Sequence, residues 1–168
     1  NDITENITSD IKLFADDTSL YVTIDGNNDE ANAQLNQDLE TINKWASKWI
    51  VLYNPSKSKS LAVSLKKNCE NIKQPLIFNG EMLENVNSHK HLGIELNSTL
   101  TWKEHITTIC SAANKKVGIL ACLKHLLDRK SLTTMYTSFI RPSLEYGNVI
   151  WCNCSSAEND VLESVQKR

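Results

Sequence analysis

The sequence predicts an α+β fold in two parts: antiparallel β-hairpins with a packed helix in residues 1–100, followed by an α-helical portion in residues 101–168. Two patterns carry this prediction. Short runs of β-branched and aromatic residues between turn residues dominate the first part, whereas apolar residues recur at helical spacing through the second. The chain has 168 residues, 40% hydrophobic and 23% charged, which is the composition of a folded globular protein rather than a disordered one.

The first expected element is a β-hairpin in residues 11–24. The runs Ile11 to Phe14 and Ser19 to Ile24 are rich in β-branched and aromatic residues, and apolar side chains alternate along the second run. Ala15-Asp16-Asp17-Thr18 separates the two runs. The two aspartates are therefore expected at the tip of the hairpin.

One helix is expected after the hairpin. Asp29 and Glu30 follow a run of turn residues and suit the positive N-terminal end of a helix. The apolar stripe that comes next consists of Leu35, Leu39, Ile42, Trp45 or Ala46, and Trp49. It predicts a helix of about five turns. We expect Trp45 and Trp49 to be core residues that pack under the sheet.

More strands are expected to join the first sheet. Asn54-Pro55-Ser56-Lys57-Ser58-Lys59 is typical of a turn, and Ser60 to Leu65 alternates as a strand does. Asn79-Gly80 joins two short apolar runs and suits a tight hairpin turn. One further strand is expected at His91 to Leu96, where Gly93 marks either a bulge or a close approach of another backbone.

The second part is expected to be helical, with a domain boundary near residue 100. One helical face carries Trp102, Ile106, Ile109, Ala113, Val117 and Leu120. A second stripe, Leu132 to Ile140, is expected to end before Pro142 because the residue preceding a proline avoids helical dihedrals. Ser155-Ser156-Ala157-Glu158 has capping-box spacing and predicts a last helix. Tyr136, Tyr146 and Trp151 are expected in the core.

Charge is unevenly distributed along the chain. Residues 1–50 hold 3 Lys/Arg and 10 Asp/Glu, a balance of −7, and the remainder holds 15 basic and 10 acidic residues, a balance of +5. This split fits an acidic metal site beside a polyanion-binding surface, and solvated helix faces would produce it equally well.

Cysteine content and apolar patterning bear on the setting of the protein. Five cysteines without paired zinc-site spacing indicate free thiols in a reducing compartment. The first residues lack the pattern of a secretory signal, and the longest uninterrupted apolar runs are only a few residues. We therefore expect an intracellular protein of nucleus or cytoplasm, not secreted and without a membrane partner.

The adjacent carboxylates of Asp16 and Asp17 are the sharpest chemical feature of the sequence. Two neighbouring negative charges at a hairpin tip repel one another, and a divalent cation would neutralise them. Magnesium suits such a site because it takes few protein carboxylates and completes its shell with water and phosphate oxygens. An ordinary aspartate-rich turn is the alternative.

An ordered series of motifs resembles the reverse transcriptases of non-LTR retrotransposons of the LINE or jockey type. Phe14-Ala15-Asp16-Asp17-Thr18 is similar to the polymerase motif with paired aspartates. The later motifs are the Leu35 to Trp49 helix, Asn54-Pro55-Ser56-Lys57-Ser58, His91-Leu92-Gly93-Ile94, the Leu100 to Ile106 run, and the Phe139 to Gly147 run. Their order and spacing hold over nearly the whole chain.

The resemblance implies the C-terminal half of a polymerase palm in residues 1–100 and a truncated helical thumb in residues 101–168. It implies nucleotidyl transfer by two metal ions, Mg²⁺ or Mn²⁺, with Asp16 and Asp17 as catalytic metal ligands. Lys57 would act on the departing pyrophosphate, with Lys59 as a nearby competitor, although each could be a solvated loop lysine.

The same resemblance assigns nucleic-acid contacts. Leu92 and Gly93 would form a primer grip through backbone contact, with a simple β-bulge as the alternative. The implied partners are an RNA template, a DNA primer and deoxynucleotide triphosphates. Basic residues that would contact phosphates without sequence preference are Lys59, Lys115, Lys116, Arg129 and Lys130, and exposed helix faces also carry such residues without that role.

Parts of the family's active site are not found in this sequence. The family has a third carboxylate on an earlier strand, together with fingers and a nucleotide-pocket motif, but only fifteen residues precede Asp16. We therefore expect a reverse transcriptase fragment that is inactive by itself. The alternatives are a non-catalytic nucleic-acid-binding or protein-interaction remnant and an unrelated metal-binding α+β domain.

Overall fold

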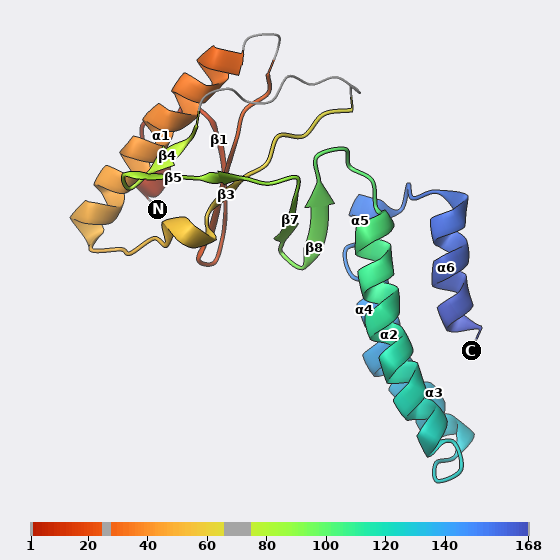
Figure 1. Ribbon diagram of the computed structural model, residues 1–168. Helices are drawn as coiled ribbons and strands as arrows, with labels where there is room; N and C mark the ends of the chain where they lie inside the picture. The colour runs from red at the N-terminus through yellow and green to blue at the C-terminus, as the bar shows by residue number, and fades with distance from the viewer. Residues whose placement is uncertain (1, 25–27, 66–74, 168) are drawn as a thin grey trace. The chain divides into compact units, whose positions relative to one another are not determined.

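The computed structural model describes residues 2–24, 28–65 and 75–167 and combines helices with short strands (Figure 1). The α+β class that the sequence predicts is confirmed. The chain divides into two compact units, Asn1–Asn87 and Ser88–Arg168. The division falls before the hairpin at residues 88–97, which the sequence had grouped with the first part, so this hairpin packs with the helices of the second unit.

The described residues of the first unit form one long helix and three pairs of strands. Its elements are η1 (Asp2–Thr4), β1 (Asp10–Phe14), β2 (Asp17–Tyr21), α1 (Asn28–Trp49), η2 (Pro55–Lys57), β3 (Lys59–Ser60), β4 (Ile77–Phe78), β5 (Glu81–Met82) and β6 (Glu84–Asn85). The predicted hairpins β1–β2 and β4–β5 are confirmed, and both are antiparallel. Gly80 has a φ of 78° in the second turn, as its predicted role requires.

The expectation of one extended first sheet is wrong. The described strands of the chain form four separate two-stranded sheets, and β3 pairs with β6 in parallel. The strand expected at Ser60 to Leu65 shrinks to Lys59–Ser60. The alternation of apolar and polar residues in this segment suits a strand, but a strand also needs a partner to pair with. Residues 61–65 have no partner among the described strands.

Helix α1 packs its apolar stripe against the N-terminal segment and β4. Ile42 and Ala46 of the helix are buried, as are Ile3 and Phe78, and Leu76 and Ala31 are buried as well. Tyr53 adds an edge-to-face contact with Phe78, their ring centroids 5.6 Å apart. The predicted helix is confirmed from Asn28 to Trp49.

The prediction that Trp45 and Trp49 are core residues is wrong. Trp45 is half-buried and Trp49 is 54% exposed. Their indole Nε1 atoms instead donate hydrogen bonds of 2.9 and 3.0 Å to the two carboxylate oxygens of Asp2. The hydrogen bond from Trp45 is the main cause that holds the pKa of Asp2 below its ordinary value. The pair therefore fastens the N-terminal segment to the end of α1.

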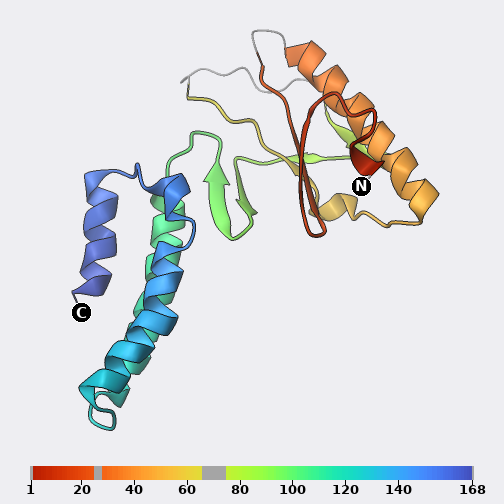
Figure 2. The same cartoon turned by 180° about the vertical axis from the view of Figure 1, so that it is seen from behind.

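The second unit consists of one hairpin and a set of helices, seen from both sides in Figures 1 and 2. Its elements are β7 (Ser88–His91), β8 (Ile94–Asn97), α2 (Lys103–Leu123), α3 (Arg129–Met135), the π-helical η3 (Tyr136–Ile140), α4 (Arg141–Glu145), α5 (Asn148–Trp151) and α6 (Ser156–Gln166). Helix α2 is central, because α6, η3, α4 and β8 all contact it.

The core of the second unit follows the predicted face of α2. Its buried residues are Ile94, Trp102, Ile106, Cys110, Ala113, Ile140, Leu144, Trp151, Leu162 and Val165. Trp151 is a core residue as expected, whereas Tyr136 is half-buried and Tyr146 is 57% exposed, so the expectation for Tyr146 is wrong. The Tyr146 hydroxyl donates a hydrogen bond to the Leu92 carbonyl, in the turn between β7 and β8.

Two helix ends test the sequence rules. The capping box at Ser155 and Glu158 is confirmed in both directions. The expected stop before Pro142 is wrong: the helical path continues into α4, with Pro142 in its first turn, where a missing amide hydrogen is tolerated. One turn of π-helix over Tyr136–Ile140 precedes the proline and widens the backbone locally.

Among the described helices, α2 is the one that is long and apolar enough to span a membrane by length and composition. The expectation of no membrane partner rested on the absence of long uninterrupted apolar runs, which is a stricter criterion than mean hydropathy over a whole helix. One face of α2 is buried in the core of the second unit.

Candidate functional site

The paired aspartates lie at the tightest kind of hairpin connection. Phe14 pairs with Asp17 in the β1–β2 register, so the connection is the two-residue turn Ala15-Asp16. Ala15 has a φ of 52°, in the left-handed region that two-residue hairpin turns require at this position. Asp16 therefore lies in the turn itself, and Asp17 is the first residue of β2. Both are exposed.

The two faces of this hairpin differ in exposure. Asp17 and Phe14 form a cross-strand pair, and Phe14 is 64% exposed. Side chains alternate along a strand, so Thr18 lies on the opposite face. There its Oγ1 lies 3.4 Å from the Tyr53 hydroxyl, at hydrogen-bond distance. The face of the hairpin with Thr18 thus packs against Tyr53, and Asp17 lies on the opposite, exposed face.

The chemistry of the two carboxylates fits a hard divalent cation. The carboxylates of Asp16 and Asp17 make no hydrogen bond or ion pair with another described residue, and aspartate oxygens are the ligands that Mg²⁺ prefers. The described residues contain no group of three or more His, Cys, Asp or Glu side chains placed to hold a metal ion. This turn therefore offers two ligands, and the rest of a metal shell must come from elsewhere.

A buried carboxylate anchors the root of the same hairpin. Asp38 of α1 is fully buried and accepts hydrogen bonds from the Thr8 backbone amide at 3.0 Å and the Ser9 amide at 2.7 Å. Burial by itself would raise the pKa of Asp38, but the hydrogen bonds from Ser9 and Thr8 outweigh it and hold the pKa below its ordinary value. Asp38 thus remains charged and fixes the chain immediately before β1.

The turn with the candidate lysines packs near the aspartate hairpin within the first unit. Asn54 caps η2 by accepting a hydrogen bond of 3.1 Å from the Ser56 amide, and Tyr53 just before it contacts Thr18. In both views the hairpin tip lies close to η2 (Figures 1 and 2). Lys57 at the end of η2 is exposed, whereas Lys59 forms an ion pair with Glu84. Lys57 is therefore the freer of the two cations.

The second predicted site, Leu92 and Gly93, is also a two-residue hairpin turn. His91 pairs with Ile94, and Leu92 and Gly93 have φ values of 46° and 85°. The continuous strand expected at His91 to Leu96 is wrong, as is the alternative of a bulge at Gly93. The expected close approach is present, but it comes from a side chain: a Cβ on Gly93 would lie 3.1 Å from Cε1 of Tyr146.

The candidate phosphate-binding residues of the second unit are all exposed, but they are not equivalent. The ammonium of Lys116 donates hydrogen bonds of 3.0 Å to the Phe139 carbonyl and to Ser143 Oγ. It thereby bridges α2 to the π-helical turn and has a structural role. Arg129 and Lys130 begin α3, which Asp128 caps by accepting a 2.7 Å bond from the Ser131 amide.

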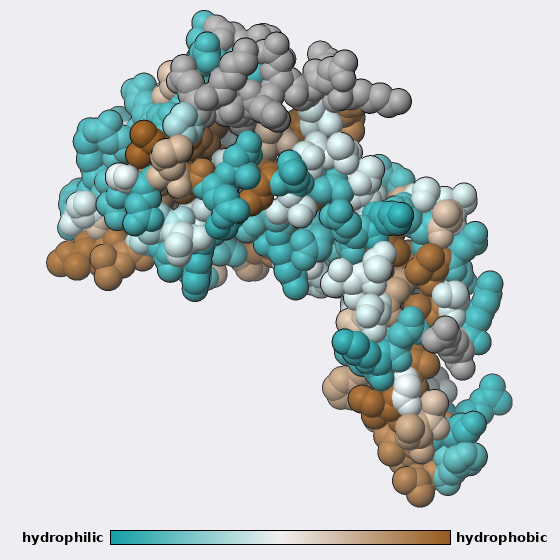
Figure 3. All heavy atoms as spheres, in the orientation of Figure 1, coloured by the Kyte–Doolittle hydropathy of each residue, from teal (hydrophilic) through white to brown (hydrophobic). Residues whose placement is uncertain are grey.

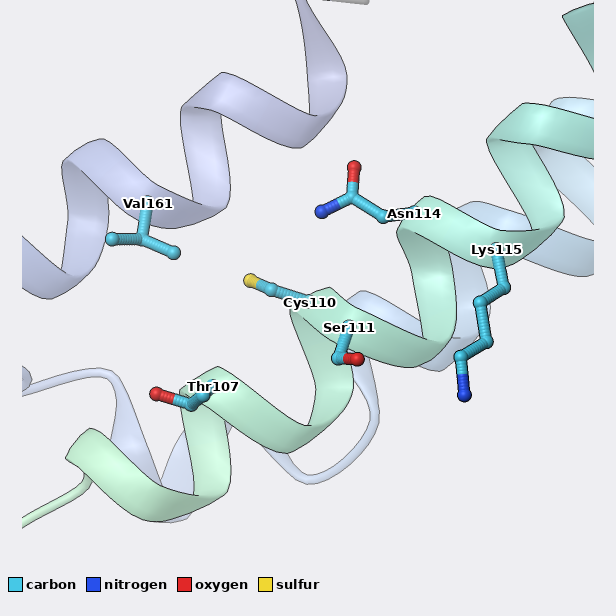
Figure 4. A pocket seen from close by; sticks show the side chains of 6 residues that line it. All are labelled: Thr107, Cys110, Ser111, Asn114, Lys115 and Val161. Carbon is cyan, nitrogen blue, oxygen red and sulfur yellow. The ribbon is translucent and has the colours of Figure 1, made fainter.

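Lys115 borders an open groove between α2 and α6. The groove has a volume of about 530 Å³ and is lined by Thr107, Cys110, Ser111, Asn114, Lys115 and Val161 (Figure 4). In that view the Lys115 side chain points away from Val161 and α6. Burial raises the pKa of the Cys110 thiol, so this cysteine stays protonated. The groove holds no charged cluster, and Lys115 faces solvent at its rim.

An apolar patch covers the C-terminal end of α1. Trp49, Ile50 and Leu52 are exposed, the last two by 87% and 95%. Figure 3 shows the patch as brown atoms at the end of α1. Large exposed apolar groups of this kind are typical of a surface that another protein segment covers.

The chain is related in sequence to RNA-directed DNA polymerases of jockey-type, non-LTR mobile elements, which confirms the resemblance that the motifs predicted. It is 27% identical over 164 residues, 94% of the chain, to "Probable RNA-directed DNA polymerase from transposon BS" of Drosophila melanogaster, and it covers 18% of that protein. It is 29% identical over 141 residues, 82% of the chain, to "RNA-directed DNA polymerase from mobile element jockey" of the same organism, 15% of which it covers.

A third relative, "Probable RNA-directed DNA polymerase from transposon X-element" of Drosophila melanogaster, is 24% identical over 161 residues. The match covers 94% of this chain and 17% of that protein. The chain thus spans less than a fifth of the length of these curated relatives. No family model and no solved structure matches the chain.

Sequence reasoning missed two residues that shape the candidate sites. Asp38 holds the root of the aspartate hairpin, and Tyr146 contacts the Leu92-Gly93 turn. An acidic residue on the same helical face as Ile42 was a signal for Asp38, because a charge on a buried face must have partners. Nothing local in the sequence signals the partner of Tyr146, which lies 54 residues away.

Proposed function

We propose that this chain is the part of an RNA-directed DNA polymerase that carries the paired aspartates of the palm and the following thumb. The observation that supports the proposal best is the open two-residue turn with Asp16 and Asp17, in a chain related to such polymerases along its length. In the full-length enzyme the substrates would be an RNA template, a DNA primer and deoxynucleotide triphosphates.

Each candidate residue has a separate task in this proposal. Asp16 and Asp17 would hold Mg²⁺ or Mn²⁺, which when bound stabilise the attacking and leaving oxygens of nucleotidyl transfer. Lys57, exposed at the end of η2, would neutralise the departing pyrophosphate. Asp38 and Tyr53 orient the hairpin from its root and from its packed face.

The proposal includes inactivity of the isolated chain. Two carboxylates at an exposed turn hold a divalent cation weakly and do not align a triphosphate, and alignment supplies much of the rate of such a reaction. We expect the purified chain to produce no primer extension on an RNA template with Mg²⁺ or Mn²⁺. Extension that is lost in Asp16→Asn would contradict this expectation and would show that the chain itself completes the site.

Duplex binding tests the thumb assignment without requiring catalysis. We expect salt-sensitive binding of an RNA–DNA duplex, with the salt slope reduced by about one for each phosphate-contacting charge removed in Lys115→Ala, Arg129→Ala and Lys130→Ala. Lys44→Ala is the matched control, because Lys44 forms an ion pair with Glu40 on the first unit. A chain that does not bind the duplex at low salt would contradict the thumb assignment.

A further inference from the structure

The turn at Leu92 and Gly93 is covered by one side chain from a distant part of the second unit. The Tyr146 hydroxyl donates a 2.9 Å hydrogen bond to the Leu92 carbonyl. Its ring lies against Gly93, so closely that a Cβ there would be 3.1 Å from Cε1. The phenol thus contacts both residues of the turn, while the ring as a whole remains 57% exposed.

The next residue, Gly147, lies close to the hairpin just after the turn. It has a φ of 64°, and a Cβ at this position would lie 2.6 Å from Cδ1 of Ile94, the residue that follows the turn. Glycine is needed here both for the left-handed backbone and for the close approach of Ile94. Tyr146 therefore contacts Leu92 and Gly93, and Gly147 lies against Ile94.

Tyr146 is also connected to strand β8 of the hairpin through two buried residues, Trp151 and His105. Trp151 Nε1 donates a 3.0 Å hydrogen bond to the Tyr146 carbonyl, and the Trp151 ring lies 5.8 Å from that of His105, centroid to centroid. His105 Nδ1 in turn accepts a 3.3 Å bond from the Glu95 amide of β8. Because Trp151 is 5% and His105 2% exposed, this closed set of contacts gives Tyr146 a rigid base.

Such support matters because the backbone of Leu92 is strained. A residue with a Cβ avoids the left-handed region, and Leu92 has a φ of 46°. Strained backbone of this kind persists where the surrounding structure holds it and is concentrated at sites that bind ligands. The hydrogen bond to the Leu92 carbonyl acts directly on the strained residue.

We propose that Tyr146 is a positioning residue that sets the Leu92-Gly93 turn for contact with the primer strand. This inference rests on the proposed function and on the primer-grip role that the resemblance to reverse transcriptases implies for this turn. The carbonyl of Leu92 is engaged by Tyr146, and the phenol fixes the direction in which the turn presents its backbone. Tyr146 itself acts through the turn and need not touch the primer.

The test compares Tyr146→Phe with the wild-type chain in two measurements. The variant keeps the ring contact with Gly93 and loses only the hydrogen bond. We expect amide hydrogen exchange over residues 91–95 to become about fivefold faster, the effect of losing one hydrogen bond of ordinary strength. The second measurement is photo-cross-linking from a reactive nucleotide at the primer 3′ end to the peptide that contains Leu92 and Gly93, which is expected to fall at unchanged duplex affinity.

Tyr21→Phe is the matched control, because Tyr21 is a partly exposed phenol on the first unit. Unchanged cross-linking in Tyr146→Phe, with the wild-type chain cross-linked at the turn, overturns this inference and leaves the proposed function intact. A wild-type chain that binds the duplex without cross-linking at the turn overturns the primer-grip role, and the inference falls with it. Hydrogen exchange still distinguishes the two failures, because it reports the Tyr146 contact without nucleic acid.

Discussion

The two hairpin tips are turns of the same length and differ in what surrounds them. Each is a two-residue turn whose first residue is left-handed, with φ values of 52° at Ala15 and 46° at Leu92. The Asp16 tip is exposed and its carboxylates make no bond to other described residues, whereas Tyr146 covers the Leu92 tip. One tip is therefore completed by the protein, and the other is left open for ligands.

Both hairpins are nevertheless anchored by buried side chains that lie outside the turns. A buried acid, Asp38, binds the segment before β1, and a buried imidazole, His105, binds the Glu95 amide of β8. The difference between the tips thus reflects local contacts and not a general looseness of the first unit. Four changes test this comparison, from the largest expected effect to the smallest.

Asp38→Asn is expected to have the largest effect. The variant loses the charge that accepts two backbone amides, so the free energy of unfolding of the first unit should fall by about 3 kcal/mol, measured by urea unfolding. Because the folded pKa of Asp38 is lowered, its stabilisation is present above the ordinary value of 3.8 and is lost as the pH falls through the folded pKa.

The matched control for Asp38 is Glu40→Gln, an exposed position of the same helix whose ion pair with Lys44 contributes about 0.5 kcal/mol or less. Equal losses in the two variants would show that the buried carboxylate does not anchor the hairpin.

Gly147→Ala should destabilise the second unit by about 2 kcal/mol. The new Cβ meets Ile94 and sits on a left-handed backbone, which alanine adopts reluctantly. Gly118→Ala is an informative control, because Gly118 lies inside α2 with open space around its Cα. That change should stabilise the helix by about 1 kcal/mol. Thermal unfolding of both variants checks the prediction, and a shift in the same direction for both contradicts it.

Acidification should weaken the second unit through His105. Burial is the largest cause that lowers its pKa below the ordinary 6.5; Lys90 also lowers it, and Glu95 opposes the shift. The unfolded chain then binds the proton first, so stability is greatest above pH 6.5 and falls at lower pH, by at most about 1.4 kcal/mol per pH unit. The slope should disappear in His105→Gln and persist in His125→Gln, an exposed control. If the pH dependence of stability is unchanged in His105→Gln, another titrating group must cause it.

The smallest effect is expected for glycine at the open tip. Ala15→Gly removes a Cβ from a left-handed residue and so relieves backbone strain in the folded state. This gain should exceed the cost of the greater entropy of the unfolded chain, so that stability rises by about 0.5 kcal/mol. Leu92→Gly relieves the same strain at the covered tip but also frees a turn that Tyr146 holds. Amide exchange of the two hairpins in the two variants measures this difference, and destabilisation by Ala15→Gly would show that its backbone is not strained.

The sequence predicted local structure well where a local rule decides it. The hairpin at Asp16, the turn at Asn79-Gly80 and the capping box at Ser155 all depend on neighbouring residues, and each is confirmed. The single first sheet, the stop before Pro142 and the core role of Trp49 were wrong. Each of these depends on a partner far along the chain, such as Asp2 for Trp49, or on a π-helical turn that absorbs the proline.

The candidate sites follow the same division. Asp16, Asp17 and Gly93 were identified from their local motifs, and the structure places all three at hairpin tips. The partners of the lysines could not be predicted from the sequence, because the Lys59 contact with Glu84 and the Lys116 contact with Phe139 are long-range. For the same reason the link from Tyr146 to Leu92 became visible only in the folded unit.

Paramagnetic broadening by Mn²⁺ tests the central claim most directly, namely that the open tip is a divalent-cation site of a polymerase. In a titration of the wild-type chain followed by amide NMR, broadening should begin at residues 15–18 at millimolar or lower Mn²⁺. It should disappear in Asp16→Asn/Asp17→Asn. Broadening that begins elsewhere, or that survives in the double variant, would contradict the account.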